Sequence, residues 1–218
     1  MCKENPLFLE KLQKFRLVPV IVIDDAESAN PLAEAIVAGG LSCVEITLRT
    51  GGALETIKTM AARPELTVGA GTVFTVDQAQ AAVDLGARFI VSPGMSTTLV
   101  DWCLAHQIPV IPGCATPTEI QAAMERGLDT VKFFPAEQLG GVKMLVTLAS
   151  VFQTMHFMPT GGISAGNLLQ YLALPQVVAC GGSWLVKTEW LRERKFAEIR
   201  QEIEKTVTLL ERGAARCL

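Results

Sequence analysis

A rhythm of short apolar runs, repeated eight times along the chain, constrains the fold more than any other feature. The runs begin roughly every 20 to 26 residues, and segments with the apolar spacing of helices lie between them. Repeated strand and helix units predict parallel strands joined by right-handed crossovers. Eight of them predict an α/β fold of the (β/α)8 TIM barrel type, with a doubly wound open sheet as the alternative. The runs are 17–23, 42–48, 66–70, 88–92, 108–112, 130–134, 156–160 and 176–180.

Helix signals support this interpretation. Thr75 with Gln78, and Thr116 with Glu119, have the spacing of capping boxes at helix starts. The first 15 residues are expected to form a helix that precedes the barrel. Residues 190–213 are expected to form one long amphipathic helix that follows it.

Length and composition indicate how many domains the chain forms. The chain has 218 residues, of which 50% are hydrophobic and 19% are charged, and this excludes a disordered protein. No linker or low-complexity stretch interrupts the repeat. We therefore expect a single barrel domain over residues 1–218.

The charge and cysteine content indicate which kinds of binding partner and which cellular compartment to expect. The net charge of −3, from 22 acidic and 19 basic residues, gives no basic field for nucleic acid. No apolar run reaches the roughly 18 residues that span a bilayer, and the charged N-terminus is unlike a signal peptide. The six cysteines include no C-x-x-C pair, which favours small buried thiols over a redox or zinc site. These features predict a cytoplasmic protein without nucleic-acid or membrane partners.

Charged residues interrupt one strand where an apolar pattern is expected. Alternation along residues 43–49 places Glu45, Thr47 and Arg49 on one face and apolar side chains on the other. Because the apolar face of a barrel strand packs under helices, the polar set should point inward. Buried charges are costly unless they are paired or used, and these lie toward the strand's carboxyl end, where barrel active sites form.

A lysine stands in a similar position in a later strand. In residues 130–134, Lys132 and Phe134 share one face, which is expected to be the inner one. Burial and a neighbouring cation such as Arg49 both disfavour the charged form of an amine, and a neutral amine is what imine formation requires. The alternative is an inert buried salt bridge between Lys132 and Glu45. Spacing and strand position favour neither interpretation over the other.

Glycine-rich turns follow several of the predicted strands. Turns of this kind expose backbone N–H groups that can bind a phosphate, and in barrels the phosphate site usually follows strands seven and eight. The relevant segments are 69–72, 92–94, 160–164 and 181–183.

The sequence does not predict a metal or a cofactor. His106 and His156 are its two histidines, and neither has a second histidine or a carboxylate at metal-ligand spacing. A catalytic zinc site requires a cluster of such ligands. A metal-free route through a lysine is therefore the simpler expectation.

The motifs together resemble those of a known family. VPVIVI, VEITLRT, VGAGTV, SPG, IPG with TPTE, KFFPAE, PTGGIS and GGSWLV occur here in the same order as in bacterial 2-keto-3-deoxy-6-phosphogluconate (KDPG) aldolases. Members of that family often also act as 4-hydroxy-2-oxoglutarate (KHG) aldolases. The resemblance extends from about residue 17 to 187. The related phosphogalactonate aldolases usually lack the TLRT and KFFPAE spellings, which favours the gluconate branch.

The resemblance implies roles for the motif residues nearest the chemistry. The lysine of KFFPAE, Lys132, would be the Schiff-base nucleophile, and the glutamate of VEITLR, Glu45, the general acid/base. Arg49 and Thr72 would hold the substrate carboxylate. The remaining members of the set are Pro93, which would line the pocket, Phe134, which would pack beside the imine, and Gly161, Gly162, Gly182 and Ser183, which would form the phosphate end.

The implied reaction is class I aldol cleavage of a 2-keto acid. KDPG would give pyruvate and glyceraldehyde 3-phosphate, and KHG would give pyruvate and glyoxylate. The resemblance also implies small-molecule keto-acid substrates, no cofactor and a homotrimer. Two alternatives remain: a phosphosugar isomerase or epimerase on the same barrel, which has no need for Lys132, and a non-catalytic barrel that binds an anionic metabolite as a sensor or scaffold.

Overall fold

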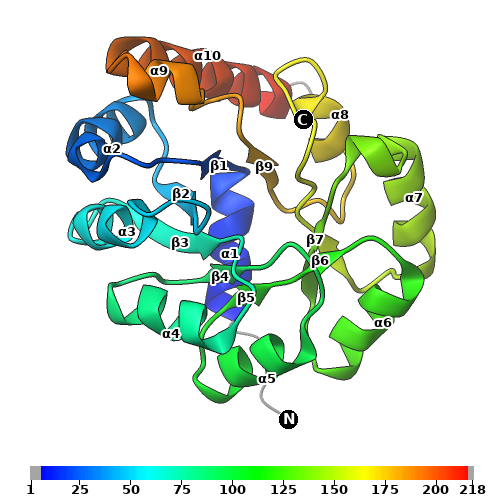
Figure 1. Ribbon diagram of the computed structural model, residues 1–218. Coiled ribbons are helices and arrows are strands. Elements are labelled where there is room, and N and C mark those ends of the chain that lie inside the picture. Colours follow the sequence, from blue (N-terminus) through cyan, green and yellow to red (C-terminus); the bar gives the residue numbers. More distant parts are fainter. Residues whose placement is uncertain (1–5, 216–218) are drawn as a thin grey trace.

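Parallel strands curl around the centre of the protein, and most helices lie on their outer side (Figure 1). The structure is a computed structural model that describes residues 6–215. It is an α/β fold, as expected. The strands are β1 (Leu17–Ile21), β2 (Cys43–Thr47), β3 (Thr67–Gly71), β4 (Ile90–Val91), β5 (Val110–Ile111), β6 (Gly113–Cys114), β7 (Thr130–Phe133), β8 (His156–Phe157) and β9 (Cys180–Gly182).

Hydrogen bonding divides the curled sheet into two parts. One has six strands in the order β5-β4-β3-β2-β1-β9, and the other has three in the order β6-β7-β8. Two isolated parallel bridges, Phe157 with Val177 and Thr160 with Gly181, connect the region of β8 to that of β9. β5 and β6 are separated by Pro112, so the chain passes directly from one part to the other.

The helices lie between successive strands, as the repeat predicts. The capping boxes at Thr75 and Thr116 are confirmed, with both reciprocal hydrogen bonds present in each. Their bounds are α1 (Pro6–Phe15), α2 (Ala29–Ala38), α3 (Ala53–Ala61), α4 (Val76–Asp84), α5 (Thr97–Ala105), α6 (Pro117–Glu125), α7 (Gly141–Val151), α8 (Leu168–Leu172), α9 (Thr188–Arg192) and α10 (Phe196–Ala215), with short 3-10 turns η1 (Ala26–Ser28) and η2 (Glu137–Leu139).

Each predicted run overlaps a strand, but several strands are shorter or displaced. Pro109 and Pro112 flank β5 and Pro159 follows β8; proline has no N–H to continue a ladder. The prediction of a strand over 176–180 is wrong in its bounds, because β9 begins at Cys180 and includes the two glycines interpreted as a turn. A Cβ on Gly181 would lie 2.3 Å from Thr160 Oγ1. Because any side chain there would clash with Thr160, this position requires glycine.

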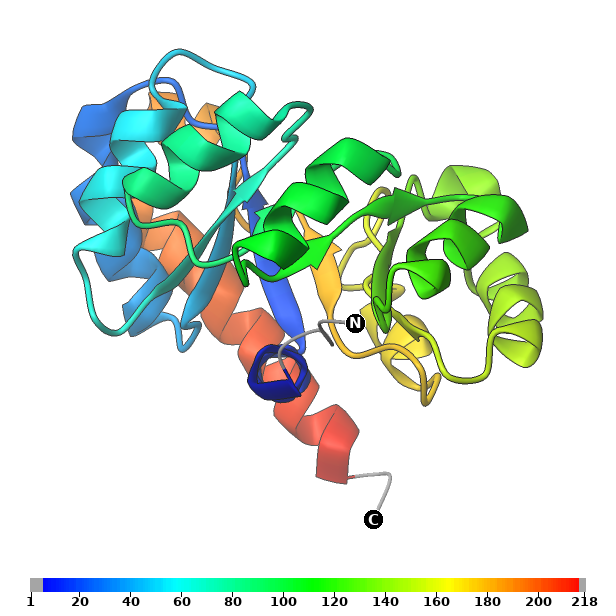
Figure 2. The ribbon, with the colours of Figure 1, turned by 90° about the horizontal axis from the view of Figure 1, so that it is seen from below.

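The prediction of one helix over 190–213 is also wrong in part. α9 ends at Arg192, Arg194 adopts a left-handed φ of 51°, and α10 begins at Phe196. The N–H of Lys195 donates to the Trp190 carbonyl at 2.8 Å, which closes the end of α9. No glycine or proline marks this break in the sequence. Figure 2 shows α10 as the long helix that runs along one side of the molecule.

Helix α1 covers the amino-terminal ends of the strands. Phe8 and Leu12 pack with Val18, at the start of β1, and with Phe89, just before β4. The rings of Phe8 and Phe89 lie 5.2 Å apart. Residues 6–15 thus confirm the predicted helix, while residues 1–5 lie outside the described part. Because α1 fills this end with apolar side chains, polar chemistry is left to the opposite end.

Four of the six cysteines lie within the described part, and all four are buried and free, as predicted: Cys43, Cys103, Cys114 and Cys180. Burial raises the pKa of Cys103 and of Cys114 to about 12, so both stay protonated near neutral pH. Cys2 and Cys217 lie outside the described residues. No helix among residues 6–215 is long and apolar enough to cross a membrane.

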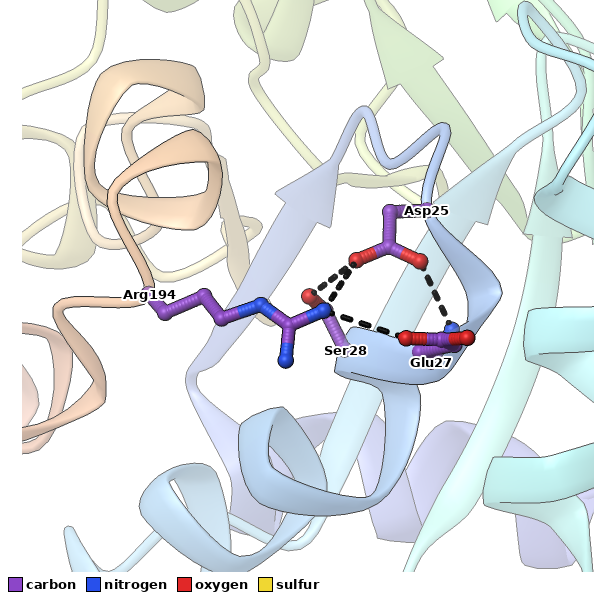
Figure 3. Close-up of polar contacts among 4 residues, drawn as sticks. All are labelled: Asp25, Glu27, Ser28 and Arg194. Atoms are coloured by element: carbon purple, nitrogen blue, oxygen red, sulfur yellow. Dashed lines mark hydrogen bonds and ion pairs between the residues drawn. The ribbon is translucent and has the colours of Figure 1, made fainter.

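The loop after β1 is joined to the segment between α9 and α10 (Figure 3). Asp25 accepts hydrogen bonds from Ser28 Oγ at 2.9 Å and from the N–H of Glu27 at 3.0 Å. The Arg194 guanidinium lies 3.4 Å from Asp25 and 3.1 Å from Glu27. Arg194 thereby bridges two acidic side chains of the loop, although all three side chains are largely exposed and the ion pairs are weak.

We expect the Asp25 carboxyl to titrate below its usual value of 3.8 in the folded protein. The hydrogen bonds from Ser28 and Glu27, followed by the charge of Arg194, favour the ionised form and lower its pKa. The contribution to stability is therefore present at neutral pH and is lost as pH falls through the lowered pKa. NMR titration of the carboxyl measures the pKa. The difference in unfolding midpoint between wild type and Asp25→Asn should shrink toward zero in acid; a constant difference would contradict this assignment.

Candidate active site

A cavity of about 160 Å³ lies at the carboxyl ends of the strands, opposite α1. Nine of the ten residues predicted as site residues line it, and they come from six different parts of the chain. Its wall contains both polar and apolar side chains. Its lining comprises Val20, Val22, Glu45, Thr47, Arg49, Thr72, Pro93, Lys132, Phe134, Thr160, Gly161, Gly162, Ile163, Gly181 and Ser183.

An ion pair occupies the closed end of this cavity. Lys132 Nζ, on β7, lies 3.2 Å from Glu45 Oε1, on β2. Lys132 is 5% exposed and Glu45 is fully buried, so the two charges face each other largely without water. The inward orientation predicted from strand alternation is therefore confirmed for both residues. Burying two charges costs folding free energy, so a buried ion pair beside a cavity indicates a functional site.

The second carboxylate oxygen of Glu45 has no partner. Oε2 is buried and forms no hydrogen bond with any described residue. Gly71 makes room for this side chain, since a Cβ there would lie 2.1 Å from Oε1. An unpartnered acceptor beside a lysine and a cavity is placed to bind a hydroxyl group or a water molecule.

Thr72 and Arg49 lie on the wall beside the pair. Thr72 has a φ of 55°, which is unusual for a β-branched residue and is typical of strain at functional sites. Arg49 is exposed and makes no ion pair with another described residue. Its guanidinium can therefore bind an anionic ligand without breaking an existing contact. Thr47 instead donates its hydroxyl to the Ile21 carbonyl at 2.8 Å and joins β1 to β2.

Phe134 and Pro93 form the apolar part of the wall. Lys132 Nζ lies 5.3 Å from the centroid of the Phe134 ring, within the range of a cation–π contact. The Pro93 carbonyl approaches Gly113, where a Cβ would lie 2.2 Å from it. This close packing holds Pro93 against Gly113, which pairs with Lys132 in the sheet.

A tight turn at the far side of the cavity presents backbone N–H groups. Gly161 and Gly162 have left-handed φ values of 98° and 79°. The carbonyls of Thr160 and Gly161 accept from the N–H groups of Ala136 at 2.8 Å and Glu137 at 3.1 Å. Within residues 6–215, no hydrogen bond uses the N–H of Gly161, Gly162 or Ile163. The turn therefore has free donors suited to an anion.

The prediction that Gly182 lines the site is not supported, because this residue is absent from the cavity wall. A Cβ on Gly182 would lie 2.1 Å from the Trp184 ring, so its Cα faces that side chain. Alternation along β9 explains the absence of Gly182 from the wall, since Gly181 and Ser183 share the inner face. Thr160 and Gly181 also line the wall; they lie in the glycine-rich segments indicated by the sequence but were not among the ten predicted site residues.

Comparison with known proteins decides the family. A sequence profile described as KDPG and KHG aldolase matches residues 9–202. The 2-dehydro-3-deoxy-phosphogluconate aldolase of Treponema pallidum (strain Nichols) is 44% identical over 202 residues, which cover 92% of this chain and 96% of that protein. The chain belongs to the KDPG and KHG aldolase family. It is an enzyme of the aldolase class.

Solved structures of related aldolases share the fold. The 2-keto-3-deoxy-6-phosphogluconate aldolase of Zymomonas mobilis ZM4, solved with 3-phosphoglycerate, superposes with a TM-score of 0.86 at 39% identity and covers 91% of this chain and 94% of that one. The KDPG aldolase of Legionella pneumophila, solved with pyruvate as a covalent carbinolamine, gives a TM-score of 0.87 at 39% identity and covers 89% and 95%.

A second, larger cavity of about 570 Å³ opens beside the first in this aldolase. Val22 belongs to both walls, and Asp24, Asp25 and Arg192 supply the polar part of the larger one. It contains no lysine and no buried ion pair. Within residues 6–215, no group of three His, Cys, Asp or Glu side chains is arranged to hold a metal ion. The smaller cavity therefore remains the candidate active site.

Proposed function

We propose that this aldolase cleaves KDPG to pyruvate and glyceraldehyde 3-phosphate through a Schiff base on Lys132. The observation that carries the proposal is the buried pair of Lys132 and Glu45 at the closed end of a cavity, with an unpartnered Glu45 oxygen. The lysine is a nucleophile, and the carboxylate is close enough to move protons for it. The related Legionella aldolase holds pyruvate as a covalent carbinolamine, which is the expected first adduct of such a lysine.

Lys132 and Glu45 each act in different steps of the reaction. The neutral Lys132 amine attacks the C2 ketone to form a carbinolamine, and loss of water gives a protonated imine. Glu45 accepts the C4 hydroxyl proton, directly or through a water molecule, as the C3–C4 bond breaks. The bond electrons move into the imine and form an enamine, while the aldehyde leaves. Protonation of the enamine at C3 and hydrolysis release pyruvate and regenerate Lys132.

The wall beside Lys132 orients the keto acid. Arg49, which makes no other ion pair in the described part, binds the substrate carboxylate, and Thr72 adds a hydrogen bond next to it. Phe134 and Pro93 exclude water and hold the imine plane. Fixing the carboxylate aligns the scissile bond with the imine π system.

The glycine turn binds the phosphate. Gly161 and Gly162 supply free N–H groups, and Ser183 adds a hydroxyl from the neighbouring end of β9. The related Zymomonas aldolase was solved with 3-phosphoglycerate, a phosphorylated acid of similar size to the aldehyde product. A phosphate at the turn and a carboxylate at Arg49 would hold the two ends of KDPG on opposite sides of Lys132.

The substrate range follows from the same arrangement. KHG has no phosphate but shares the 2-keto acid end, and the family description includes KHG aldolases. We expect the purified protein to release pyruvate from both acids, with kcat/KM for KDPG at least about tenfold higher because the turn adds charge-assisted hydrogen bonds. Initial rates of pyruvate release from each acid measure this. Absence of pyruvate from both acids would refute the proposed function.

We further propose that residues 1–218 form one domain and that the curled sheet closes as a (β/α)8 barrel. The bridges from Phe157 to Val177 and from Thr160 to Gly181 support closure between β8 and β9. We propose a homotrimer in the cytoplasm, as the family resemblance implies. Phe74, 59% exposed, supplies apolar surface for an interface, and the buried free thiols suit a reducing compartment. Light scattering of the purified protein gives the subunit number.

A further inference from the structure

The turn that presents Gly161 and Gly162 is held in place by a side chain from outside the cavity. Glu137, in η2, donates its N–H to the Gly161 carbonyl at 3.1 Å. Its side chain also covers Gly162, where a Cβ would lie 2.6 Å from Glu137 Cβ and Cγ. The backbone and side chain of Glu137 thus both contact the turn.

The Glu137 carboxylate is itself fixed by a buried tyrosine. The Tyr171 hydroxyl, on α8, donates a hydrogen bond to Glu137 Oε1, and Tyr171 is fully buried. Gly141 leaves the space that this contact needs, because a Cβ there would lie 3.0 Å from Oε1 and 3.2 Å from the Tyr171 hydroxyl. Burial, with the hydrogen bond to Glu137 adding to it, raises the pKa of Tyr171, so the hydroxyl stays a donor.

The orientation of this carboxylate matters for an anionic ligand. Glu137 lies in η2, which supports the turn, but its side chain does not line the cavity. A carboxylate turned toward the cavity would repel a phosphate at Gly161 and Gly162. The bond from Tyr171 holds the carboxylate on the α8 side, away from that position.

Asn167 holds the other end of the turn. Its Nδ2 donates to the Gly162 carbonyl at 3.1 Å, and its Oδ1 accepts from the N–H of Ser164 at 2.8 Å. Together with Glu137, it occupies the carbonyls of the turn, so the N–H groups are left to face the ligand. Asn167 contacts only the backbone at that end, and Tyr171 is the one residue in the described part that donates a hydrogen bond to the Glu137 carboxylate.

We propose that Glu137 and Tyr171 are positioning residues that make the turn selective for phosphorylated substrates. This inference rests on the proposed function. The hydrogen-bonded pair fixes Gly162 and directs a negative charge away from the phosphate. No hydrogen bond or ion pair in the described part joins Glu137 or Tyr171 to Lys132 or Glu45. The pair therefore affects binding of the phosphate and not the aldol chemistry.

Tyr171→Phe is expected to raise KM for KDPG by about tenfold, the order expected for weakening one charge-assisted hydrogen bond, with kcat within about twofold. The kinetic constants for KHG, which has no phosphate, should stay within about twofold. Glu137→Gln keeps an acceptor for Tyr171 and should lose less affinity for KDPG than Glu137→Ala, which should reproduce the full KDPG defect. Equal losses on KDPG and KHG would overturn the proposal.

Phosphate binding provides a test that does not require catalysis. Inorganic phosphate, titrated into wild type and Tyr171→Phe and followed by 31P NMR, should bind the variant about tenfold more weakly. Equal affinity, or no binding by wild type, would overturn the positioning role whether or not the protein cleaves KDPG. Thr206→Val is the matched control, because it removes a buried hydroxyl that donates to the Glu202 carbonyl within α10 and should leave phosphate affinity unchanged.

Discussion

Replacing Lys132 by alanine is expected to abolish aldol cleavage, with a loss in kcat of more than about 10⁴-fold, the order seen when a covalent nucleophile is removed. The physical reason is that Lys132 is the one lysine on the cavity wall within residues 6–215. Removing it also leaves the fully buried Glu45 without its counter-ion, so we expect a lower unfolding temperature. Pyruvate release and circular dichroism measure the two effects separately.

Chemical trapping tests the covalent step directly. Pyruvate with borohydride should convert wild type to a protein that carries one reduced pyruvate, detected as a mass increase on the peptide containing Lys132. Lys132→Ala should remain unmodified. A double variant, Lys132→Met with Glu45→Gln, is the control for stability, because it removes both buried charges and should recover part of the lost unfolding temperature without recovering activity. Unmodified wild type after this treatment would refute the Schiff-base mechanism.

Strand alternation predicted the centre of the site because it depends only on local geometry. Glu45 and Lys132 each interrupt an apolar run on the face opposite to their apolar neighbours, so their inward orientation follows from the two-residue period of a strand. The distance of 3.2 Å between them could not be predicted, since it depends on how β2 and β7 approach across the interior. The inert salt bridge and the catalytic pair also look alike in sequence; the unpartnered Glu45 oxygen is the structural feature that favours catalysis.

Errors arose where a residue's role depends on distant contacts. Gly181 and Gly182 have the sequence of a turn, yet they lie in β9 because they pair with β1, at positions where Thr160 and Trp184 leave no space for a Cβ. Arg194 breaks the predicted C-terminal helix without glycine or proline. The contact of Tyr171 with Glu137 joins residues 34 positions apart, and nothing in either local pattern indicates it. Local periodicity predicts on which face of a strand or helix a side chain lies. Tertiary packing determines which residues it contacts on that face.

Glu45→Gln separates catalysis from charge pairing, because glutamine keeps the shape of the side chain but cannot accept a proton. We expect kcat for cleavage to fall by about 10²- to 10⁴-fold, the usual contribution of a general acid/base. Prolonged incubation with pyruvate and borohydride should still label Lys132, since the nucleophile remains. Thr47→Val, on the same inner face of β2, is the matched control: its hydroxyl donates to the Ile21 carbonyl and should affect stability more than kcat.

The two experiments on Glu45 distinguish the remaining interpretations of the buried pair. If Glu45 were only a counter-ion, the glutamine variant would leave Lys132 as a less stabilised cation and therefore a better nucleophile, so kcat would hold or rise. If Glu45 moves the C4 hydroxyl proton, labelling by pyruvate persists while carbon–carbon cleavage is lost. Wild-type kcat in Glu45→Gln would refute the second role. A buried carboxylate with one oxygen on the lysine and the other without a partner among the described residues fits proton transfer, because it has an acceptor available for the C4 hydroxyl proton.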